Sequence, residues 1–406
     1  MPKKILIFSL AYFPKHVGGA EVAIKEITDR LSPEAYEFHM VCNRFDTTLP
    51  REEQVGNVYV HRIGFTKHNA DTQSLFHPIF YFVKILYVPG AAFKAWQLHR
   101  KLSFDGFWCM MLYMSYPVAL LRMISVRIPY ALTLQEGDTF ERVFERWYIK
   151  LFSPILLFGI RHATVVQSIS TFLDGWAKKK GYTGQSVVVP NAVNTKHFMQ
   201  SYSDTELQAT RTELGLSEDD VALVTTSRLV EKNAVDDVVR AIALLPPRVK
   251  FVVFGTGPDG DKLKSLIAKL QITDRVLLRG QISHEVMPKY LKACDIFIRP
   301  SRSEGMGNSF VEAMAAELPV IATQEGGIAD FLFDAKRNPD TPTTGWAVDA
   351  NSPEQIKQAV EDILSNPDSV NAVLATAKQM AVEKYDWNLI ADRMDKEVFQ
   401  PLYTNV

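Results

Sequence analysis

The feature that most constrains the fold is an alternation of short, β-rich apolar runs with longer helical patterns. In the first half of the chain the runs are KILIFSL, FHMVCN, VYVHRI, GFWCMM, PYALTLQ, ATVVQS and VVVP. Continuous apolar runs of this length are typical of parallel strands that helices cover on both faces. The pattern therefore predicts an α/β fold built on a buried parallel sheet.

The alternation restarts after the segment VVVPNAVNTKHF, with VALVTTS, KFVVFG, VLLRG, DIFIRP, PVIAT and GWAVDA. Because 406 residues exceed what one core usually holds, we expect two Rossmann-like domains. A cleft between two such sheets is a favoured ligand site. We predict an N-terminal domain at 1–190, a C-terminal domain at 191–383, and a helix at 384–406 that crosses back onto the first domain.

Charge and cysteine content limit the classes of ligand and compartment. The 45 basic and 46 acidic residues argue against a duplex nucleic-acid binder, which needs a broad cationic face. Cys42, Cys109 and Cys294 lack metal-type spacing, so we expect reduced thiols in a cytosolic protein. The apolar run of MPKKILIFSLAYFP is too short for a secretory signal and is predicted to be the first strand.

Two aromatic-rich stretches, residues 75–98 and 144–160, hold few charges. Prolines and basic residues interrupt both, leaving about ten uninterrupted apolar residues where a membrane span needs about 20. One interpretation is core helices of the first domain. The alternative is a peripheral face that rests on anionic lipid at the inner side of a membrane. The basic residues that would flank it are Lys84, Lys94, Arg100, Lys101, Lys178, Lys179 and Lys180.

Two basic residues follow the first strand of the second domain. In TTSRLVEKNAVDD, Arg228 comes just after the strand and Lys232 lies four residues on, in a turn. An arginine grips phosphate oxygens through its planar fork, and a lysine adds a mobile point charge. Such side chains in surface loops are usually solvated. Their place at the carboxyl end of a strand, where α/β ligands collect, favours a phosphate site.

Glycine turns follow a strand in each half. Gly18 and Gly19 precede an amphipathic helix, where glycine lets the backbone approach a ligand and the helix start offers N–H groups to an anion. A simple tight turn explains them equally well. FGTGPDG, at 254–260, repeats the arrangement. Its aspartates resemble those of metal-dependent transferases, but Asp259 is better explained as a helix cap, and we assign no metal.

The stretch SRSEGMGNSFVEAMAAELPVIAT, residues 301–323, holds Glu304 and Glu312. Ser309 and Glu312 fit a capping box, which would account for Glu312 structurally. The functional alternative places Glu312 on ribose hydroxyls and Glu304 on a sugar, with backbone amides facing a diphosphate at the helix start. Spacing alone leaves both open. The amides belong to Gly305, Met306, Gly307, Asn308 and Ser309.

In order along the chain, SRLVEK, GTGP, CDIFIRPS, EGMGNSFVEAMA, PVIAT and EGGIAD resemble the motif series of retaining glycosyltransferases of family 4. The resemblance covers nearly the whole chain and implies the two-domain GT-B fold. It implies sugar transfer from a nucleotide-diphosphate donor to a hydroxyl of a glycan, a lipid-linked sugar or another small acceptor. No cofactor beyond this co-substrate and no metal are expected.

The resemblance also implies roles for single residues. The residue matching Glu304 binds donor-sugar hydroxyls, and the one matching Glu312 binds the ribose. Those matching Arg228 and Lys232 bind the diphosphate, and all of these lie in the C-terminal domain. The Gly18-Gly19 turn matches the glycine loop of the acceptor domain, which closes against the donor phosphates.

The sequence departs from the family pattern in three places. Many relatives carry a histidine after the strand YALTLQ, near the reacting sugar, whereas this chain has Gln135, Glu136 and Asp138 there. The two carboxylates are the local candidates for a nucleophile, should the reaction proceed by double displacement. Asn233 stands where glycine is common, which we attribute to the ease with which asparagine adopts left-handed conformations. Asp330 replaces a common glutamate.

Two other classes of function fit the same fold. A nucleotide-sugar epimerase or a phosphorylase would use similar motifs, and a catalytically silent module would bind the nucleotide sugar without transfer. Fold alone does not separate them.

Overall fold

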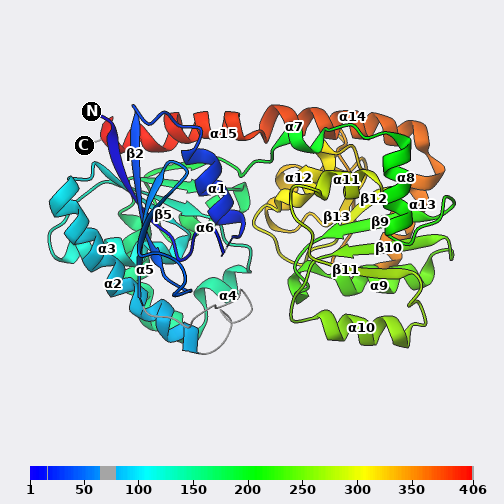
Figure 1. Cartoon of the computed structure of the whole chain (residues 1–406), viewed down its shortest axis with the longest axis horizontal. Helices are drawn as coiled ribbons and strands as arrows, with labels where there is room; N and C mark the ends of the chain where they lie inside the picture. Colours follow the sequence, from blue (N-terminus) through cyan, green and yellow to red (C-terminus); the bar gives the residue numbers. More distant parts are fainter. Residues whose placement is uncertain (16, 65–78, 405–406) are drawn as a thin grey trace. The chain divides into compact units, whose positions relative to one another are not determined.

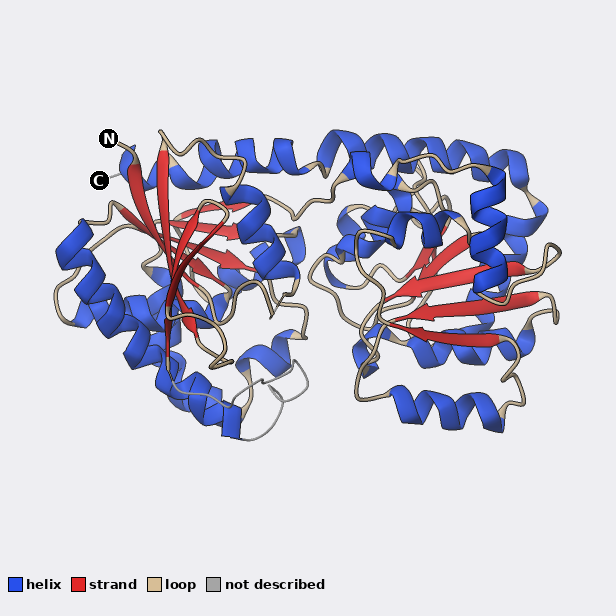
Figure 2. Ribbon diagram, in the orientation of Figure 1, coloured by secondary structure: helices blue, strands red, loops and turns tan. Residues whose placement is uncertain are grey.

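The computed structural model describes residues 1–15, 17–64 and 79–404, and the chain forms two compact units. Unit 1 comprises Met1–Asn191 and Trp387–Val406, and unit 2 comprises Ala192–Asp386. In each unit helices surround a twisted sheet (Figures 1 and 2). The chain thus enters unit 2 once and returns to unit 1 for its last segment.

The sheet of unit 1 has the strand order β3-β4-β2-β1-β5-β6-β7-β8. All neighbours are parallel except β3 and β4, so the predicted parallel sheet is confirmed and one antiparallel edge strand is added. The strands are β1 (Lys3–Phe8), β2 (Tyr36–Asn43), β3 (Glu52–Val55), β4 (Val58–Ile63), β5 (Gly106–Met110), β6 (Tyr130–Leu134), β7 (Val165–Ser168) and β8 (Gln185–Val188).

Both aromatic-rich stretches form helices of unit 1, namely α2 and α5; residues 75–78 of the first stretch lie outside the described residues. Within unit 1, α2 packs against α3, and α3 packs against α5. The helical segments of unit 1 are α1 (Gly19–Thr28), α2 (Ile79–Leu102), η2 (Leu112–Met114), α3 (Ser115–Met123), α4 (Phe140–Phe144), α5 (Trp147–Arg161), α6 (Thr171–Lys179), α15 (Trp387–Arg393), the π-helical η5 (Met394–Phe399) and α16 (Pro401–Thr404).

Unit 2 has a six-stranded parallel sheet of order β11-β10-β9-β12-β13-β14. In chain order this is 3-2-1-4-5-6, the doubly wound arrangement in which ligands collect where the order reverses, between β9 and β12. The strands are β9 (Val221–Thr226), β10 (Val249–Phe254), β11 (Val276–Gly280), β12 (Ile296–Arg299), β13 (Val320–Ala322) and β14 (Trp346–Ala347).

The helices of unit 2 cover both faces of this sheet, and buried aliphatic side chains with Phe251 fill one of the layers between them. The helical segments are α7 (Thr195–Phe198), α8 (Asp204–Glu213), η3 (Glu231–Asn233), α9 (Val235–Leu244), α10 (Gly260–Lys269), α11 (Met287–Lys292), α12 (Asn308–Ala315), η4 (Gly326–Asp330), α13 (Pro353–Ser365) and α14 (Pro367–Lys384).

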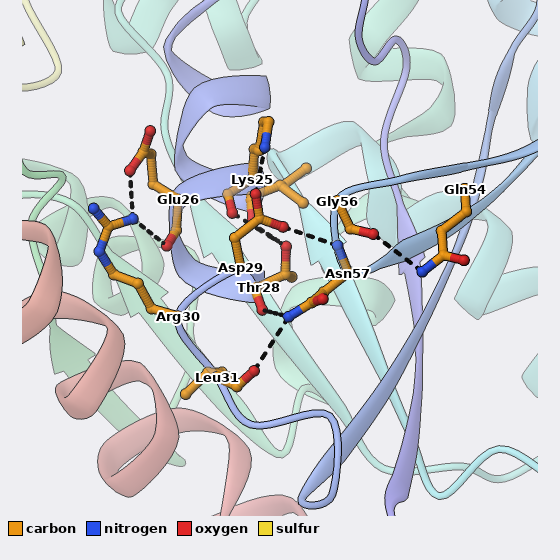
Figure 3. A network of polar contacts seen from close by, with 10 residues as sticks. Lys25, Glu26, Thr28, Asp29, Arg30, Leu31, Gln54, Gly56 and Asn57 are labelled. Carbon is orange, nitrogen blue, oxygen red and sulfur yellow. Dashed lines mark hydrogen bonds and ion pairs between the residues drawn. The ribbon is translucent and has the colours of Figure 1, made fainter.

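The end of α1 is tied to the turn between β3 and β4 by the polar network in Figure 3. Asn57 donates its backbone N–H to Asp29 Oδ1 at 2.8 Å and its side-chain amide to the carbonyl oxygen of Thr28 at 3.0 Å. Lys25 and Arg30 add ion pairs to Asp29 and Glu26. The network thus fixes the C-terminal end of the helix that Gly19 begins.

The last segment of the chain completes the core of unit 1. The ring of Phe399 is fully buried and contacts the rings of Tyr36, Phe38 and Trp108. The side chain of Leu402 lies against Gly106 of β5, where an added Cβ atom would be 3.1 Å from Leu402 Cδ1. Strands near the start of the chain therefore depend on helices at its end.

The two ends of unit 2 are hydrogen-bonded to each other. Val193 N donates to the carbonyl oxygen of Tyr385 at 2.9 Å, and Thr195 Oγ1 donates to Asp386 Oδ2 at 2.7 Å. The entering and leaving strands form an isolated parallel bridge between Val193 and Asp386. Unit 2 is thus a closed insertion in unit 1.

Candidate functional site

The predicted acidic and basic residues of unit 2 follow β9 and β12, the two strands at which the strand order reverses. Leu223 and Val224 of β9 pair with Ile296 and Phe297 of β12, so the carboxyl ends of the two strands are adjacent. The loop after β9 carries Arg228 and Lys232, and the loop after β12 carries Glu304. Topology therefore brings the two motifs to one edge of the sheet.

The carboxylate of Glu304 lies between two cations and a backbone amide. Lys232 Nζ is 3.7 Å from Oε1, and Arg299 Nη2 is 2.9 Å from Oε2. The backbone N–H of Gly305 also donates to Oε1 at 3.1 Å. The structure thus brings Glu304 and Lys232 together, while Arg228 is exposed in the same loop as Lys232.

Arg299, the last residue of β12, was not predicted. It is buried, its Nη1 donates to Ser309 Oγ at 2.9 Å, and its guanidinium lies over the ring of Phe310 at 4.2 Å. Burial lowers the pKa of this guanidinium, and the carboxylates of Glu304 and Glu312 oppose that shift. One buried cation therefore acts electrostatically on both glutamates of the motif. An arginine at the end of an otherwise apolar strand was the only signal of it in the sequence.

Of the two alternatives for Ser309 and Glu312, the capping box is not formed. Helix α12 begins at Asn308, its N-cap is Gly307 in a left-handed conformation with φ of 87°, and no side chain caps it. Glycine adopts this conformation at little cost, so the helix starts earlier than a serine cap would allow. Ser309 instead lies in the first turn and accepts the hydrogen bond from Arg299. Residues Gly305 to Ser309 form the loop and first turn, as the sequence predicted.

Glu312 is nearly buried and its carboxylate faces an exposed imidazole. His284 Nε2 lies 3.0 Å from Glu312 Oε1. His284 belongs to the segment between β11 and α11 and was not predicted from the sequence. Without a capping role, Glu312 is a helix carboxylate that contacts His284 and interacts electrostatically with the buried Arg299.

At two glycines the backbone of these loops packs so closely that a side chain would not fit. A Cβ atom at Gly326 would lie 2.1 Å from the carbonyl oxygen of Glu304, and Gly327 N donates to that oxygen at 2.9 Å. A Cβ atom at Gly257 would lie 2.3 Å from the carbonyl oxygen of Leu229. The GTGP and EGG motifs therefore support the backbone of the loops that carry the charged residues.

Arg302 ties the two loops together. Its backbone N–H donates to the carbonyl oxygen of Lys232 at 2.7 Å, and its guanidinium is 3.0 Å from both Asp236 and Asp237. Asn233 donates to the carbonyl oxygen of Arg228 at 2.7 Å. The left-handed residue is Ala234, with φ of 53°, so left-handedness was the wrong reason for the asparagine. Asn233 instead stabilises the loop through its side chain.

In unit 1 the glycine turn lies beside Gln135. Gly18 caps α1 in an extended conformation, and its N–H donates to Glu21 Oε2 at 2.8 Å. A Cβ atom at Gly19 would lie 3.7 Å from Gln135 Nε2. The amide oxygen of Gln135 is buried and has no hydrogen-bond partner among the described residues. The structure thus brings together the predicted glycine turn, which follows β1, and the predicted Gln135, which follows β6.

The two carboxylates after Gln135 have different surroundings. Glu136 is 3% exposed and accepts hydrogen bonds from Leu112 N at 2.6 Å and Gln135 N at 2.9 Å. Burial raises the pKa of this carboxyl to about 7. Asp138 is partly exposed and lies 3.5 Å from Arg142 Nε. Glu136 therefore joins the ends of β5 and β6, and Asp138 belongs to the start of α4.

Within the ranges that the structure describes, no group of three or more histidine, cysteine, aspartate or glutamate side chains is arranged to hold a metal ion. Asp259 is the N-cap residue of α10, but its side chain makes no capping hydrogen bond and instead contacts Lys262 Nζ at 2.8 Å. The three cysteines are free and buried. None of the described helices is both long and apolar enough to cross a bilayer.

Two family models match the chain in succession. The model for Glycosyltransferase Family 4 matches residues 17–197, and the model for Glycosyl transferases group 1 matches residues 208–380. Together the two matches take in the greater part of both units. An uncharacterised glycosyltransferase of Methanocaldococcus jannaschii is 23% identical over 96% of each chain.

Other curated relatives match over about half of each chain. A putative teichuronic acid biosynthesis glycosyltransferase of Bacillus subtilis is 32% identical over 51% of this chain and 50% of its own. A GDP-mannose-dependent phosphatidylinositol monomannoside mannosyltransferase of Mycolicibacterium smegmatis is 28% identical over 51% and 54%.

Solved structures share the fold over the full length. Sucrose-phosphate synthase from Thermosynechococcus elongatus superimposes with a TM-score of 0.81 at 19% identity, covering all of both chains. Anabaena HepE, solved in complex with UDP-glucose, superimposes with a TM-score of 0.75 at 18% identity and covers 98% of this chain and 99% of its own.

Proposed function

Because the chain belongs to family 4 of the glycosyltransferases and has the GT-B fold, we propose that it transfers a hexose from a nucleotide-diphosphate donor to a hydroxyl, with retention at C1. The observation that carries the proposal is the distance of 3.7 Å between Lys232 Nζ and Glu304 Oε1. A diphosphate sugar needs a cation at its phosphate and an acceptor of hydrogen bonds at its sugar hydroxyls, on either side of one C–O bond.

In the proposed reaction the positive charges stabilise the leaving diphosphate while its C1–O bond breaks. Lys232 and Arg228 supply these charges, with the amides from Gly305 to Ser309 at the start of α12. Glu304 orients the sugar ring, and the leaving phosphate oxygen takes the proton of the acceptor hydroxyl. The cations are part of the chain, so we propose that no metal is needed.

Double displacement would require a carboxylate nucleophile, and Glu136 and Asp138 are the candidates. Glu136 already accepts two backbone hydrogen bonds, and Asp138 contacts Arg142. These contacts favour the front-face reaction, in which Glu136 has a supporting role at the end of β6.

The donor and acceptor are proposed from the names of the relatives. HepE was solved with UDP-glucose, and the mycobacterial relative is GDP-mannose-dependent and acts on a phosphatidylinositol glycolipid. We propose a UDP- or GDP-hexose as donor and a glycan or lipid-linked sugar as acceptor. Because the three cysteines are free and buried, we propose a cytoplasmic location.

A thermal-shift panel of nucleoside diphosphates and their sugars identifies the donor, since a ligand that binds the native state raises Tm. We expect one nucleotide to raise Tm equally with and without EDTA. A shift that EDTA abolishes would contradict metal independence. Conversion of the donor alone into another nucleotide sugar would indicate an epimerase, and turnover only with inorganic phosphate would indicate a phosphorylase.

Glu304→Gln and Lys232→Ala should each lower the rate of transfer by orders of magnitude while the fold survives. Glutamine keeps an oxygen for Arg299 but lacks the charge, and alanine removes the cation. The control is Lys262→Ala, which removes an exposed lysine of α10 that contacts the N-cap residue Asp259. Normal transfer by both site variants would refute the assignment. NMR of the product anomer tests retention.

A further inference from the structure

Three neighbouring helices of unit 1 expose large apolar side chains. The exposed fractions of these apolar side chains run from 37% for Phe158 to 74% for Met123. Since α2 packs against α3 and α3 against α5, the helices that carry these side chains form one layer of unit 1 (Figure 1). We call them the apolar helix face; they are Ile85, Leu86 and Phe93 of α2, Met123 and Ile124 at the end of α3, and Leu151, Phe152 and Phe158 of α5.

Helix α2 is apolar on both sides. Tyr87, Ala91 and Ala95 are buried against the rest of unit 1, while Leu86 and Phe93 are more than half exposed. A helix that lies on the surface of a soluble protein normally places charged residues on its outer side. Over residues 85–93 the exposed positions of α2 are instead Ile85, Leu86, Pro89 and Phe93, which indicates a surface that a partner covers.

The charge of this layer indicates the kind of partner. The helices hold four lysines or arginines in α2, one in α3 and two in α5, and no aspartate or glutamate. The whole chain is almost neutral, with 45 basic and 46 acidic residues. Arg100, Lys101, Lys150 and Arg161 are exposed, and Arg100 lies over the ring of Trp96 at 5.1 Å. Lys94 forms an ion pair with Glu52 of β3, but the three helices themselves carry only basic charges and so complement an apolar surface with negative charge.

A bilayer that contains anionic lipid has this character, with acyl chains beneath negative headgroups. A second copy of this chain fits less well, because a symmetric pair would place the same carboxylate-free helices against each other. None of the three helices, over their described residues, is able to span a bilayer. The contact would therefore lie in the interface of one leaflet.

We infer that the apolar helix face of α2, α3 and α5 docks on an anionic lipid bilayer, with exposed basic residues of the same helices at the headgroups. The proposed sugar transfer is not a premise of this inference. Vesicle binding is measured without donor or acceptor, so the two proposals fail independently.

The test is flotation of the full chain with vesicles of phosphatidylcholine that contain, or lack, phosphatidylglycerol. We expect binding to the anionic vesicles that weakens as salt is raised. Leu86→Glu and Leu151→Glu should each lower the vesicle partition coefficient about tenfold, since each replaces an exposed leucine that would enter the lipid with a charged carboxylate. Arg100→Gln and Lys101→Gln should lower it about fivefold each.

The matched control is Leu364→Glu, at an exposed apolar position of α13 in unit 2. It should bind vesicles like the parent chain, and all variants should keep the parent Tm and donor-induced thermal shift. Absence of vesicle binding, equal loss in the Leu364 variant, or equal binding to neutral vesicles at high salt would overturn the proposal. Dimers that Leu86→Glu dissociates, without vesicle binding, would show a self-interface instead.

Discussion

The guanidinium of Arg299 is the buried centre of the candidate donor site. It bonds to Glu304 and Ser309 and acts electrostatically on Glu312. Removing one partner of a buried ion pair leaves the other charge uncompensated, whereas replacing both by apolar groups is often tolerated. Single and double variants of Arg299 and Glu304 should therefore distinguish the effect of this ion pair on stability from its effect on transfer.

We expect Arg299→Met to lower the free energy of unfolding by about 3 kcal/mol. The double variant Arg299→Met with Glu304→Met should recover much of this loss but show no transfer, because the sugar ligand is gone. Urea denaturation and a transfer assay measure both quantities. Losses that simply add would mean that the two side chains do not interact as the structure shows.

Glu136 predicts a pH dependence of stability. Its pKa rises from 4.5 to about 7 on burial, so between these values the folded chain binds more protons than the unfolded chain. The contribution to stability is therefore fully present below pH 4.5, falls as pH rises through 7, and then stays constant. Relative to Glu136→Gln, the parent should lose about 3 kcal/mol over this range.

Unfolding free energies of both proteins at several pH values test this prediction. Other titrating groups contribute equally to the two proteins and cancel in the difference. A difference that rises with pH would have the opposite sign and would show that Glu136 is stabilised as an anion.

Among the elements, the loop after β12 depends on a glycine far along the chain. Gly326 has φ of 66°, and a Cβ atom there would lie 2.1 Å from the carbonyl oxygen of Glu304. Gly326→Ala should cost about 2 kcal/mol of stability or more and weaken nucleotide-sugar binding, since the Glu304 backbone must move. Urea denaturation and the thermal shift measure both effects.

Gly260→Ala is the matched control in the same unit. An added Cβ atom at Gly260 makes only an ordinary contact of 3.8 Å with Leu229 Cδ1, at the start of α10. Its effect should stay within about 1 kcal/mol. Equal effects of the two variants would mean that Gly326 is not a packing requirement.

At this scale the strands were predictable because apolar runs mark buried parallel strands directly. The edge strand β3 was missed because EEQV is polar and pairs on one side only. The capping-box alternative was open because a serine in the right spacing resembles a cap, while the left-handed backbone of Gly307 leaves no mark beyond the glycine itself.

The candidate site was predictable only in part. Glu304 and Lys232 stand in recognisable motifs, and the structure brings them together. Arg299 and His284 were missed because their roles come from contacts made between distant segments. Spacing along the chain shows which residues follow a strand, but not which buried charge they face.

For the whole molecule, the structure predicts an asymmetry between the two units. Residues 192–386 are continuous, and their ends are hydrogen-bonded to each other. Unit 1 needs both ends of the chain, because Phe399 and Leu402 fill its core. We expect the fragment 192–386 to fold alone and to keep its nucleotide-induced thermal shift.

The fragment 1–191 should fail to unfold cooperatively unless residues 387–406 are supplied, for example through a short linker. Circular dichroism during urea denaturation distinguishes the two cases. Cooperative unfolding of 1–191 alone would show that unit 1 folds without residues 387–406.

The aromatic contacts of Phe399 with Tyr36, Phe38 and Trp108 also set the order of events during synthesis. The ribosome makes residues 1–191 of unit 1 early, yet the residues that close its core are translated last. Unit 2 is therefore complete once residue 386 has been made, whereas unit 1 is complete only after residues 387–406 follow. Domains usually mature in the order of their synthesis, and here the second unit is expected to reach its native state before the first.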